Sequence, residues 1–180
     1  MITTHVYIGT SLDGFIARKN GSFDWLSKFA DAQAIDAYEK FMAGIDVIVL
    51  GRGTFETVSG FPDWPYERPA VVLSRTLAKV PPRLGNKVSL STHKPQEVLA
   101  DLSEKGHRSV YVDGGKIIQS FLAEDLIDEL TIARVPVLLG DGIPLFGFLS
   151  GDRYFEHRHT ATYPNGLIRS YYTRQKRVQS

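Results

Sequence analysis

Short apolar runs alternate with amphipathic segments along most of this chain. Runs rich in Val, Ile and aromatic residues, bounded by Gly, Pro, Asn or Ser, are typical of strands. We expect strands over His5–Thr10 (continued after a bend by Gly14–Ala17), Ile45–Leu50, Ala70–Leu73, Lys87–Leu90, Ser109–Val112, Leu126–Pro136, Tyr154–Tyr163 and Gly166–Arg174. Apolar residues at helical spacing predict helices over Ala32–Ala43, from about Phe55, over Pro95–Glu104 and over Lys116–Leu122.

The order of these elements predicts an α/β fold. Strands and helices follow one another as β-α-β-α-β-β-α-β-α-β-β-β, which favours a mostly parallel central sheet flanked by helices on both faces. The last two strands are expected to form an antiparallel C-terminal hairpin at one edge, turned at Pro164–Gly166. With 180 residues and no repeat or linker, the chain is expected to be a single domain, residues 1–180.

Composition narrows the class of protein. A formal net charge of +1 gives no electrostatic reason to expect binding to nucleic acid or membrane. The absence of cysteine excludes disulfides, thiolate catalysis and Cys-based metal sites. No apolar run approaches the ~18 residues of a membrane span, and no signal peptide is evident, so a cytoplasmic protein is expected. The basic tail Arg174–Ser180 is interpreted as a solvated terminus.

Two junctions between strand and helix contain paired or near-paired glycines. Asp113-Gly114-Gly115 follows one apolar strand, and Gly51-Arg52-Gly53-Thr54 follows another. Such a junction lets backbone N–H groups approach a phosphate, with the positive end of the helix dipole pointing at the anion. A single junction of this kind is more often just a tight turn, but two of them in one chain suggest a dinucleotide. Neither a G-x-G-x-x-G nor a P-loop motif is present.

Seven stretches, in order along the chain, carry a resemblance to a known family. They are Ser11–Ala17, Phe23–Leu26, Gly51–Glu56, Ser74–Thr76, Asp113–Gly115, Asp128–Leu130 and Pro136–Phe146. Together they resemble the dihydrofolate-reductase-like family, and most of all its branch with the pyrimidine reductase domain of riboflavin biosynthesis and small stand-alone relatives. The resemblance implies the dihydrofolate-reductase-like fold and NADPH as cofactor.

The resemblance also implies how the cofactor is held. The loop Gly51, Arg52, Gly53 and Thr54 would bind the pyrophosphate from one side, and Gly114, Gly115, Lys116 and Ile117 from the other. A cis peptide often joins the paired glycines in this family. Ser74 and Arg75 match the position that holds the ribose 2′-phosphate, which favours NADPH over NADH; the alternative is an exposed loop. Gly9, Ile16 and Ala17 match positions that pack against the nicotinamide.

Two carboxyl groups are candidates for handling a proton during hydride transfer. A carboxyl in an apolar pocket can hold the edge of a pyrimidine or pterin and assist protonation of the C=N nitrogen. Asp36 lies near the position at which folate-reducing relatives carry their pocket acid. Ile35 could occupy that position instead, which would leave Asp36 exposed to solvent. Asp113 matches the acid before the paired glycines, and the alternative is a helix cap. Asp13 is interpreted as a turn residue.

Aromatic side chains in irregular segments are candidates for the substrate site. Trp25 and Trp64, with Phe61 and Tyr66, could form the wall of a cleft for a flat heterocycle, or pack in the core. His157 and His159 have no third partner at metal-ligand spacing, so no metal site is expected.

Two departures from the family pattern bear on the substrate. The zinc motif of the bifunctional riboflavin enzyme is missing, and Tyr7 stands where riboflavin-type reductases carry a lysine in the first strand. Their basic grip on the substrate phosphate is not evident either. The expected function is an NADPH-dependent oxidoreductase acting on a small heterocycle, either 5-amino-6-ribosylaminouracil reductase-like or dihydrofolate reductase-like. A flavin- or nucleotide-binding module without turnover is the alternative. A homodimer is expected, because members of the family often pair through strands near the C-terminus.

Overall fold

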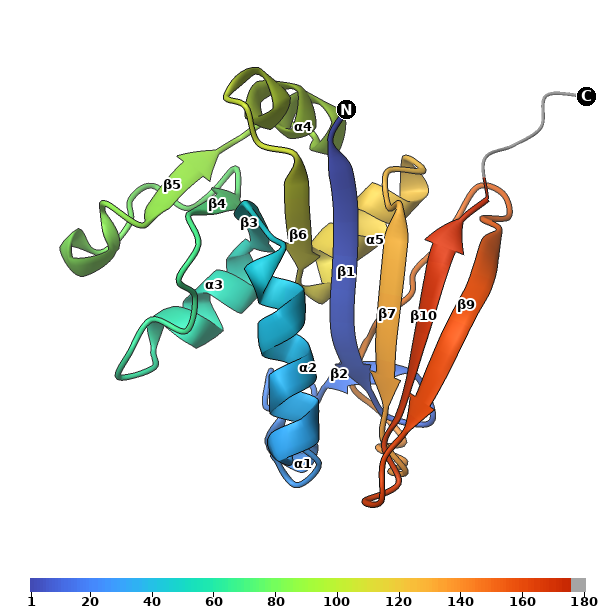
Figure 1. Ribbon diagram of the computed structural model, residues 1–180. Helices are drawn as coiled ribbons and strands as arrows, with labels where there is room; N and C mark the ends of the chain where they lie inside the picture. The colour runs from blue at the N-terminus through green and yellow to red at the C-terminus, as the bar shows by residue number, and fades with distance from the viewer. Residues whose placement is uncertain (176–180) are drawn as a thin grey trace, which may run out of the picture.

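The computed structural model describes residues 1–175 and is built on one central sheet (Figure 1). The strand order is β5-β4-β3-β6-β1-β7-β10-β9. The first six are parallel, whereas β10 runs antiparallel to β7 and β9 antiparallel to β10. The predicted fold class is therefore confirmed. The strands are β1 Thr3–Thr10, β3 Val47–Gly51, β4 Ala70–Leu73, β5 Val88–Ser91, β6 Ser109–Asp113, β7 Glu129–Arg134, β9 Phe155–Thr162 and β10 Ile168–Arg174.

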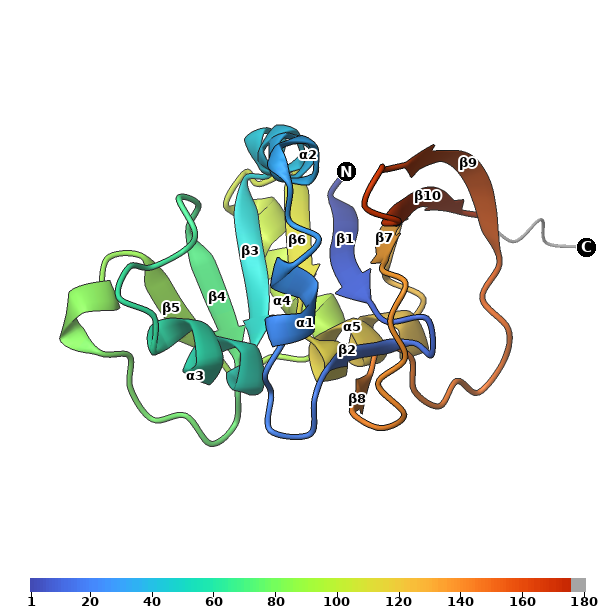
Figure 2. The ribbon, with the colours of Figure 1, turned by 90° about the horizontal axis from the view of Figure 1, so that it is seen from below.

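Helices cover both faces of the sheet. Figure 2 shows α2 on one side of the strands and α5 on the other. The N-terminus of α2 is capped by Asp31, whose carboxylate accepts from the Ala34 N–H at 2.9 Å. A second, two-stranded sheet pairs β2 with β8. The remaining elements are α1 Asp24–Ser27, α2 Ala32–Ala43, α3 Arg52–Ser59, a 3-10 turn Pro82–Leu84, α4 Pro95–Glu104, α5 Gly115–Ala123, β2 Phe15–Ala17 and β8 Ile143–Pro144.

The largest differences from the predicted elements are the start of one helix, the length of one strand and two short elements. The helix α3 begins at Arg52, directly after β3, rather than near Phe55. The strand expected over Leu126–Pro136 is limited to β7, and the residues before it also contact β1 through side-chain hydrogen bonds. The Asp128 carboxylate accepts from the Thr4 N–H at 3.0 Å. The elements α1 and β8 were not predicted, since four and two residues are too few to show a period.

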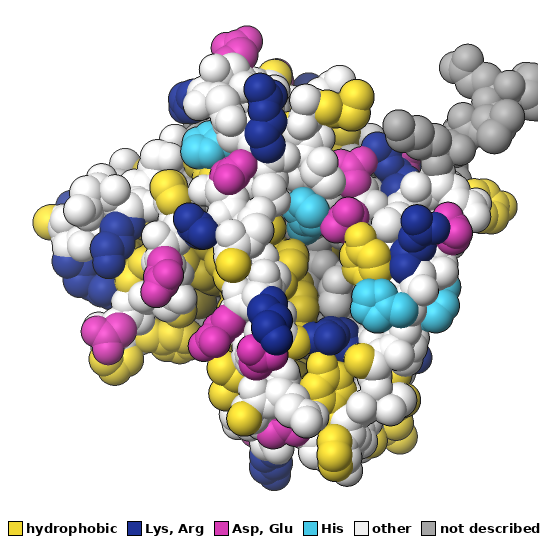
Figure 3. Space-filling view, in the orientation of Figure 1, with side chains coloured by type: hydrophobic (Ala, Val, Ile, Leu, Met, Phe, Trp, Pro, Cys, Tyr) yellow, Lys and Arg dark blue, Asp and Glu magenta, His cyan; other side chains and the backbone are white. Residues whose placement is uncertain are grey.

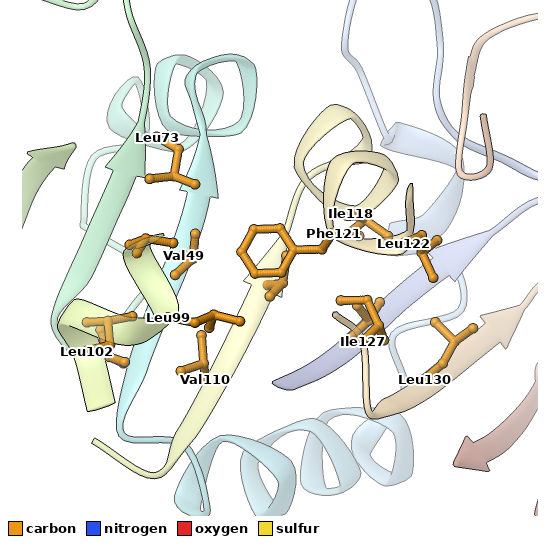
Figure 4. Packing of buried hydrophobic residues seen from close by; sticks show 14 of the residues in the cluster. Val49, Leu73, Leu99, Leu102, Val110, Ile118, Phe121, Leu122, Ile127 and Leu130 are labelled. Carbon is orange, nitrogen blue, oxygen red and sulfur yellow. The ribbon is translucent and has the colours of Figure 1, made fainter. Parts of the chain in front are cut away.

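The core lies on both faces of the parallel strands, and alternation along each strand decides which side chain faces which layer. Val110 and Val112 of β6 pack with α4 and α5, where Phe121 is fully buried (Figure 4). Tyr111, between them, packs on the opposite face in the cluster that contains Phe55 of α3 and residues of α2. All five residues of β3 are buried, as its continuous apolar run predicts for a central strand.

Two searches of the described residues concern membranes and metals. Within residues 1–175, no helix is both long and apolar enough to cross a bilayer. The same residues contain no cluster of three or more His, Asp or Glu side chains that could hold a metal ion. Residues 176–180, most of the tail interpreted as solvated, lie outside the described residues.

Candidate functional site

A cleft of about 1280 Å³ opens at the carboxyl ends of the parallel strands. Figure 2 looks onto this end of the sheet. The ends of β3 and β6 and the first turns of α3 and α5 form one part of its lining, and β1, β2 and α2 form another. Open α/β sheets bind ligands at this edge, where successive helices leave toward opposite faces.

The structure brings both glycine-containing junctions to this one cleft. A Cβ on Gly51 would lie 2.7 Å from Ile117 Cγ1 of α5, and a Cβ on Gly114 would overlap Thr54 Oγ1 of α3. Gly114 also has φ of 110°, which side chains rarely adopt. The two helix starts therefore pack against each other, and glycine is required at both contacts.

Neither helix start is capped by a side chain. Gly51 and Gly114 occupy the N-cap positions of α3 and α5, and neither helix has a side-chain cap hydrogen bond. The first N–H groups of a helix have no intrahelical acceptor, and the helix dipole adds about half a positive charge there. The exposed cations Arg52 and Lys116 stand beside these ends. This arrangement can bind an anion with two phosphate groups.

The Gly114–Gly115 peptide is trans, so the cis peptide expected from the resemblance is wrong. Among the described residues no cis peptide bond occurs. The change of direction between β6 and α5 comes instead from the positive φ of Gly114. Gly115 is packed tightly as well, since a Cβ there would lie 2.9 Å from Ile16 Cδ1.

Ser74 and Arg75 lie just beyond β4, outside the lining of the cleft. The Ser74 hydroxyl accepts from the backbone N–H groups of Thr76 and Leu77 at 3.2 and 3.0 Å, which shapes its own turn. Arg52 joins this turn to the cleft, because its Nη1 donates to Thr76 Oγ1 at 2.7 Å. The exposed Arg75 is thus held near, but not in, the part of the cleft formed by α3.

The residues matched to the nicotinamide contact lie together in the cleft lining. Gly9 is in β1, and a Cβ there would lie 2.6 Å from Leu26 Cδ2. Ile16 and Ala17 belong to β2, which pairs with β8 beside the cleft. Because Gly9 has no side chain, Leu26 can pack directly on the end of β1 at the floor of the cleft.

Asp113 is the carboxyl that the structure places in the cleft. Its Oδ2 accepts from the Tyr66 hydroxyl at 2.7 Å, and it does not cap α5, so the helix-cap alternative is wrong. Protein encloses the side chain on most sides, although it stays partly open to the cleft. Burial raises the pKa of Asp113, and the hydrogen bond from the Tyr66 hydroxyl opposes that rise.

Tyrosines surround this carboxyl. Burial and the neighbouring charge of Asp113 raise the pKa of Tyr38, Tyr66 and Tyr111 above the ordinary value. The three phenols therefore stay protonated at neutral pH, and Tyr66 and Tyr111 act as hydrogen-bond donors. Tyr111 donates to the Tyr7 carbonyl at 2.9 Å, which fixes its ring at the floor of the cleft.

The prediction that Asp36 lies in the pocket is wrong. Asp36 does not line the main cleft: its carboxylate borders a second hollow between α2 and the C-terminal strands, is 58% exposed and pairs with Lys40 Nζ at 2.8 Å. The alternative, Ile35, does line the cleft. Neighbouring residues of a helix differ by about 100° in direction, so a difference of one residue moves an acid out of the cleft.

Neither tryptophan lines the cleft, so their predicted substrate contacts are wrong. Trp25 is only 3% exposed and packs in the core with Val135 and Leu167. Trp64 packs behind Tyr66, with ring centroids 5.3 Å apart. Among the described residues, neither buried indole N–H has a hydrogen-bond partner. Of the aromatic candidates in irregular segments, Tyr66 does reach the cleft.

Several residues of the lining were not predicted. Among them are Tyr7, Leu26, Phe29, Tyr38, Tyr111 and Tyr163. Two of them could have been found from strand alternation, because residues two apart in a strand point to the same face. Tyr111 lies two residues before Asp113, and Tyr7 lies two residues before Gly9. The others come from helices and loops that approach only in the folded chain.

The fold and the cleft define a dihydrofolate-reductase-like domain. A pyrimidine reductase-like protein from Corynebacterium diphtheriae shares this fold, with a TM-score of 0.77 and 17% identity over 98% of this chain and 93% of that one. The family model described as RibD C-terminal domain matches residues 4–168. The chain belongs to the RibD C-terminal domain family.

Relatives include stand-alone and longer proteins. The uncharacterized protein YwjB of Bacillus subtilis is 33% identical over 152 residues, which are 83% of this chain and 85% of YwjB. A Shewanella structure described as a riboflavin biosynthesis protein is 41% identical with a TM-score of 0.92, covering 97% of this chain and all of that one. The riboflavin biosynthesis protein RibD of Corynebacterium ammoniagenes is 28% identical, but the match spans only 46% of its length.

Proposed function

We propose that this protein is an NADPH-dependent reductase that acts on a small pyrimidine- or pteridine-type heterocycle. The observation that carries the proposal is the convergence of two uncapped helix starts and one enclosed carboxyl, Asp113, on a single cleft. The names of longer relatives support the reaction class. One from Thermotoga maritima is a deaminase and 5-amino-6-(5-phosphoribosylamino)uracil reductase, which shares this fold at 16% identity.

The nucleotide end of the cleft fits a diphosphate. Side chains at Gly51 and Gly114 would close the space between α3 and α5, so the glycines keep the two sets of N–H donors close together. The N–H groups of Gly53 and Thr54 would hold one phosphate, and those of Lys116 and Ile117 the other. Arg75, just beyond β4, would bind the 2′-phosphate.

The substrate end supplies placement and a proton. When bound, NADPH supplies the hydride. Gly9, Ile16 and Ala17 would pack against the nicotinamide. Asp113 would hold the polar edge of the heterocycle, and because burial raises its pKa, it keeps its proton to a higher pH than an exposed acid. The protonated carboxyl then donates to the ring nitrogen, and Tyr66 fixes its orientation through their 2.7 Å hydrogen bond.

Cofactor binding is tested first, by NADPH fluorescence with the wild type and Arg75→Ala. Loss of one hydrogen-bonded charge predicts that NADPH binds roughly tenfold or more weakly to the variant, with NADH unaffected. Arg108→Ala, which removes an exposed guanidinium at the opposite end of the sheet, is the matched control. No binding above background, or an Arg75 variant equal to wild type for NADPH, contradicts the assignment.

Turnover is tested by following NADPH oxidation with dihydrofolate, dihydropterins and ribosylaminopyrimidines. Asp113→Asn should lose turnover but keep NADPH affinity, because the carboxyl lies at the substrate end. Retained turnover in this variant would remove Asp113 from the mechanism.

A flavin- or nucleotide-binding module without turnover is the second candidate. The observation that favours it is the charge distribution of the cleft: of its lining cations, Arg52 and Lys116 lie in the first turns of α3 and α5, and Lys19 is paired with Asp141. A flavin absorbance spectrum in the purified protein, together with failure to oxidise NADPH, would establish this candidate instead.

We further propose that the protein is a cytoplasmic homodimer. The strand β9 is the last in the sheet, and an edge strand offers unpaired backbone groups to a second copy. Light scattering at micromolar concentration tests the dimer, and a monomer mass would refute it.

A further inference from the structure

A second hollow lies next to the cleft. It has a volume of about 620 Å³ and lies over the sheet, between α2 and strands β7, β10 and β9. Tyr7 and Tyr163 line both spaces, so the two hollows are neighbours that share these side chains. Figure 3 shows this groove between α2 and the β9–β10 hairpin, with charged and histidine side chains around it.

Strand register places one arginine in line with the floor of the cleft. Gly9 of β1 pairs with Ala133 of β7, which pairs with Arg169 of β10. Residues directly opposite one another in a sheet point to the same face. Because Gly9 and Ala133 are small, Arg169 is the first long side chain met in this row on leaving the cleft.

The acids near this groove already have partners of their own. Asp36 pairs with Lys40 at 2.8 Å, and Glu129 Oε2 lies 2.8 Å from His5 Nδ1. Asp31 accepts from the Ala34 N–H, as the cap of α2, and from the Asn165 amide at 3.0 Å. None of these carboxylates forms an ion pair with Arg169.

Arg169 is half-buried without an acidic partner. Its Nη1 lies 3.4 Å from the Tyr7 hydroxyl, and its guanidinium carbon lies 5.6 Å from the centre of the Tyr163 ring. Among residues 1–175, no carboxylate lies within 4.0 Å of it. A planar guanidinium held on an aromatic face presents its remaining N–H groups as a fork suited to carboxylate or phosphate.

We propose that Arg169 and the Tyr7 hydroxyl bind an oxyanion on the substrate, a carboxylate or a phosphate monoester. The inference deepens the proposed function, on which it rests for the position of the ring at Asp113. Asp113 and Arg169 lie on strands three places apart, ~14 Å across the sheet at ~4.8 Å per strand. The Arg169 side chain reaches back to Tyr7 of β1, beside β6. The substrate is then a flat ring with a short chain that ends in the oxyanion.

The preference for an anionic substrate is measured by calorimetry with matched ligands. The phosphate pair is 5-amino-6-(5-phosphoribosylamino)uracil and its dephosphorylated form; the carboxylate pair is pteroic acid and its methyl ester. Wild type should bind the anionic member of one pair roughly ten- to a hundredfold more tightly. Which pair responds identifies the oxyanion.

Variants assign that preference to Arg169. In Arg169→Gln the two members should bind equally, Arg169→Lys should keep part of the preference, and the surface control Arg108→Gln should keep all of it. Thermal melts confirm that each variant is folded. An unchanged preference in folded Arg169→Gln overturns the proposal.

A second measurement separates this proposal from the reductase assignment. Inorganic phosphate and acetate are titrated into the protein without cofactor, and arginine Nε–Hε resonances are followed by NMR. The Arg169 resonance should shift and saturate, while that of Arg108 does not. An Arg169 resonance that responds no more than Arg108 overturns the anion site. A saturating response without NADPH binding supports the site and rejects the reductase.

Discussion

Gly53→Ala should make the protein more stable and at the same time weaken its binding of NADPH. Gly53 lies in the first turn of α3, and a Cβ built on it has no atom within 4 Å. Replacing a helical glycine by alanine gains about 0.5–1 kcal/mol. For a domain of this size, 1 kcal/mol corresponds to about 2–4 °C, so the melting temperature should rise by about 1–4 °C.

Because the Cα–Cβ bonds of a helix tilt toward its N-terminus, the same methyl group is directed toward the end of α3 at which the proposed phosphate would lie. A hydrogen bond to a charged group contributes about 1.5–3 kcal/mol. Lengthening or losing one such bond predicts affinity for NADPH lower by roughly ten- to a hundredfold. Stability and affinity therefore move in opposite directions, which a general loss of folding cannot produce.

Scanning calorimetry of the cofactor-free protein gives the melting temperature, and NADPH fluorescence gives the affinity. Gly151→Ala is the matched control. It adds the same methyl group outside the cleft, where the nearest atom is Arg153 Nη1 at 3.9 Å, and should leave affinity unchanged. If Gly53→Ala binds NADPH as tightly as wild type does, the first turn of α3 is not a phosphate site.

Other substitutions test the carboxyl and the core. Asp113→Asn should be more stable than wild type to urea at pH 7.5, with the difference vanishing below about pH 4. Burial raises the pKa of Asp113 in the folded state, so ionisation of this carboxyl opposes folding only above the pH at which it ionises in the unfolded chain. Equal stability of the variant and the wild type at pH 7.5 would contradict this reasoning. Tyr66→Phe removes a hydrogen bond to the ionised carboxyl, so the pKa of Asp113 measured by carboxyl NMR should rise further; a fall would refute the role of Tyr66. Phe121→Ala, at a fully buried position, should lower the unfolding free energy by about 3–5 kcal/mol. A loss below ~1 kcal/mol would mean that α5 and the sheet repack around the smaller side chain.

Local signals explain which parts of the fold could be predicted. The helix α4 has the predicted bounds Pro95–Glu104 because proline occupies its first turn and Glu97 bonds back to the Lys94 N–H at 2.8 Å. The C-terminal hairpin turns at Gly166, whose φ of 89° matches the turn expected there. Each of these features depends on residues adjacent in the sequence.

The direction of a side chain within an element was harder to predict. Asp36 and Ile35 are neighbours on one helix, and only the packing of α2 on the sheet decides which faces the cleft. Trp64 and Tyr66 lie in the same irregular segment, and composition does not distinguish them. The structure places the hydroxyl-bearing ring against Asp113 and the indole behind it.

The cleft itself follows from a topology that chain order does not show. The strands β3 and β6 are neighbours in the sheet although α3, β4, β5 and α4 separate them in sequence. The helix after β3 packs on the same face as α2, whereas the helix after β6 packs on the opposite face. Two adjacent strands followed by helices on opposite faces leave a crevice between their first turns. Glycine at Gly51 and Gly114 lets the two helix starts approach across that crevice, so the same two residues that join the layers expose the N–H groups proposed to bind phosphate.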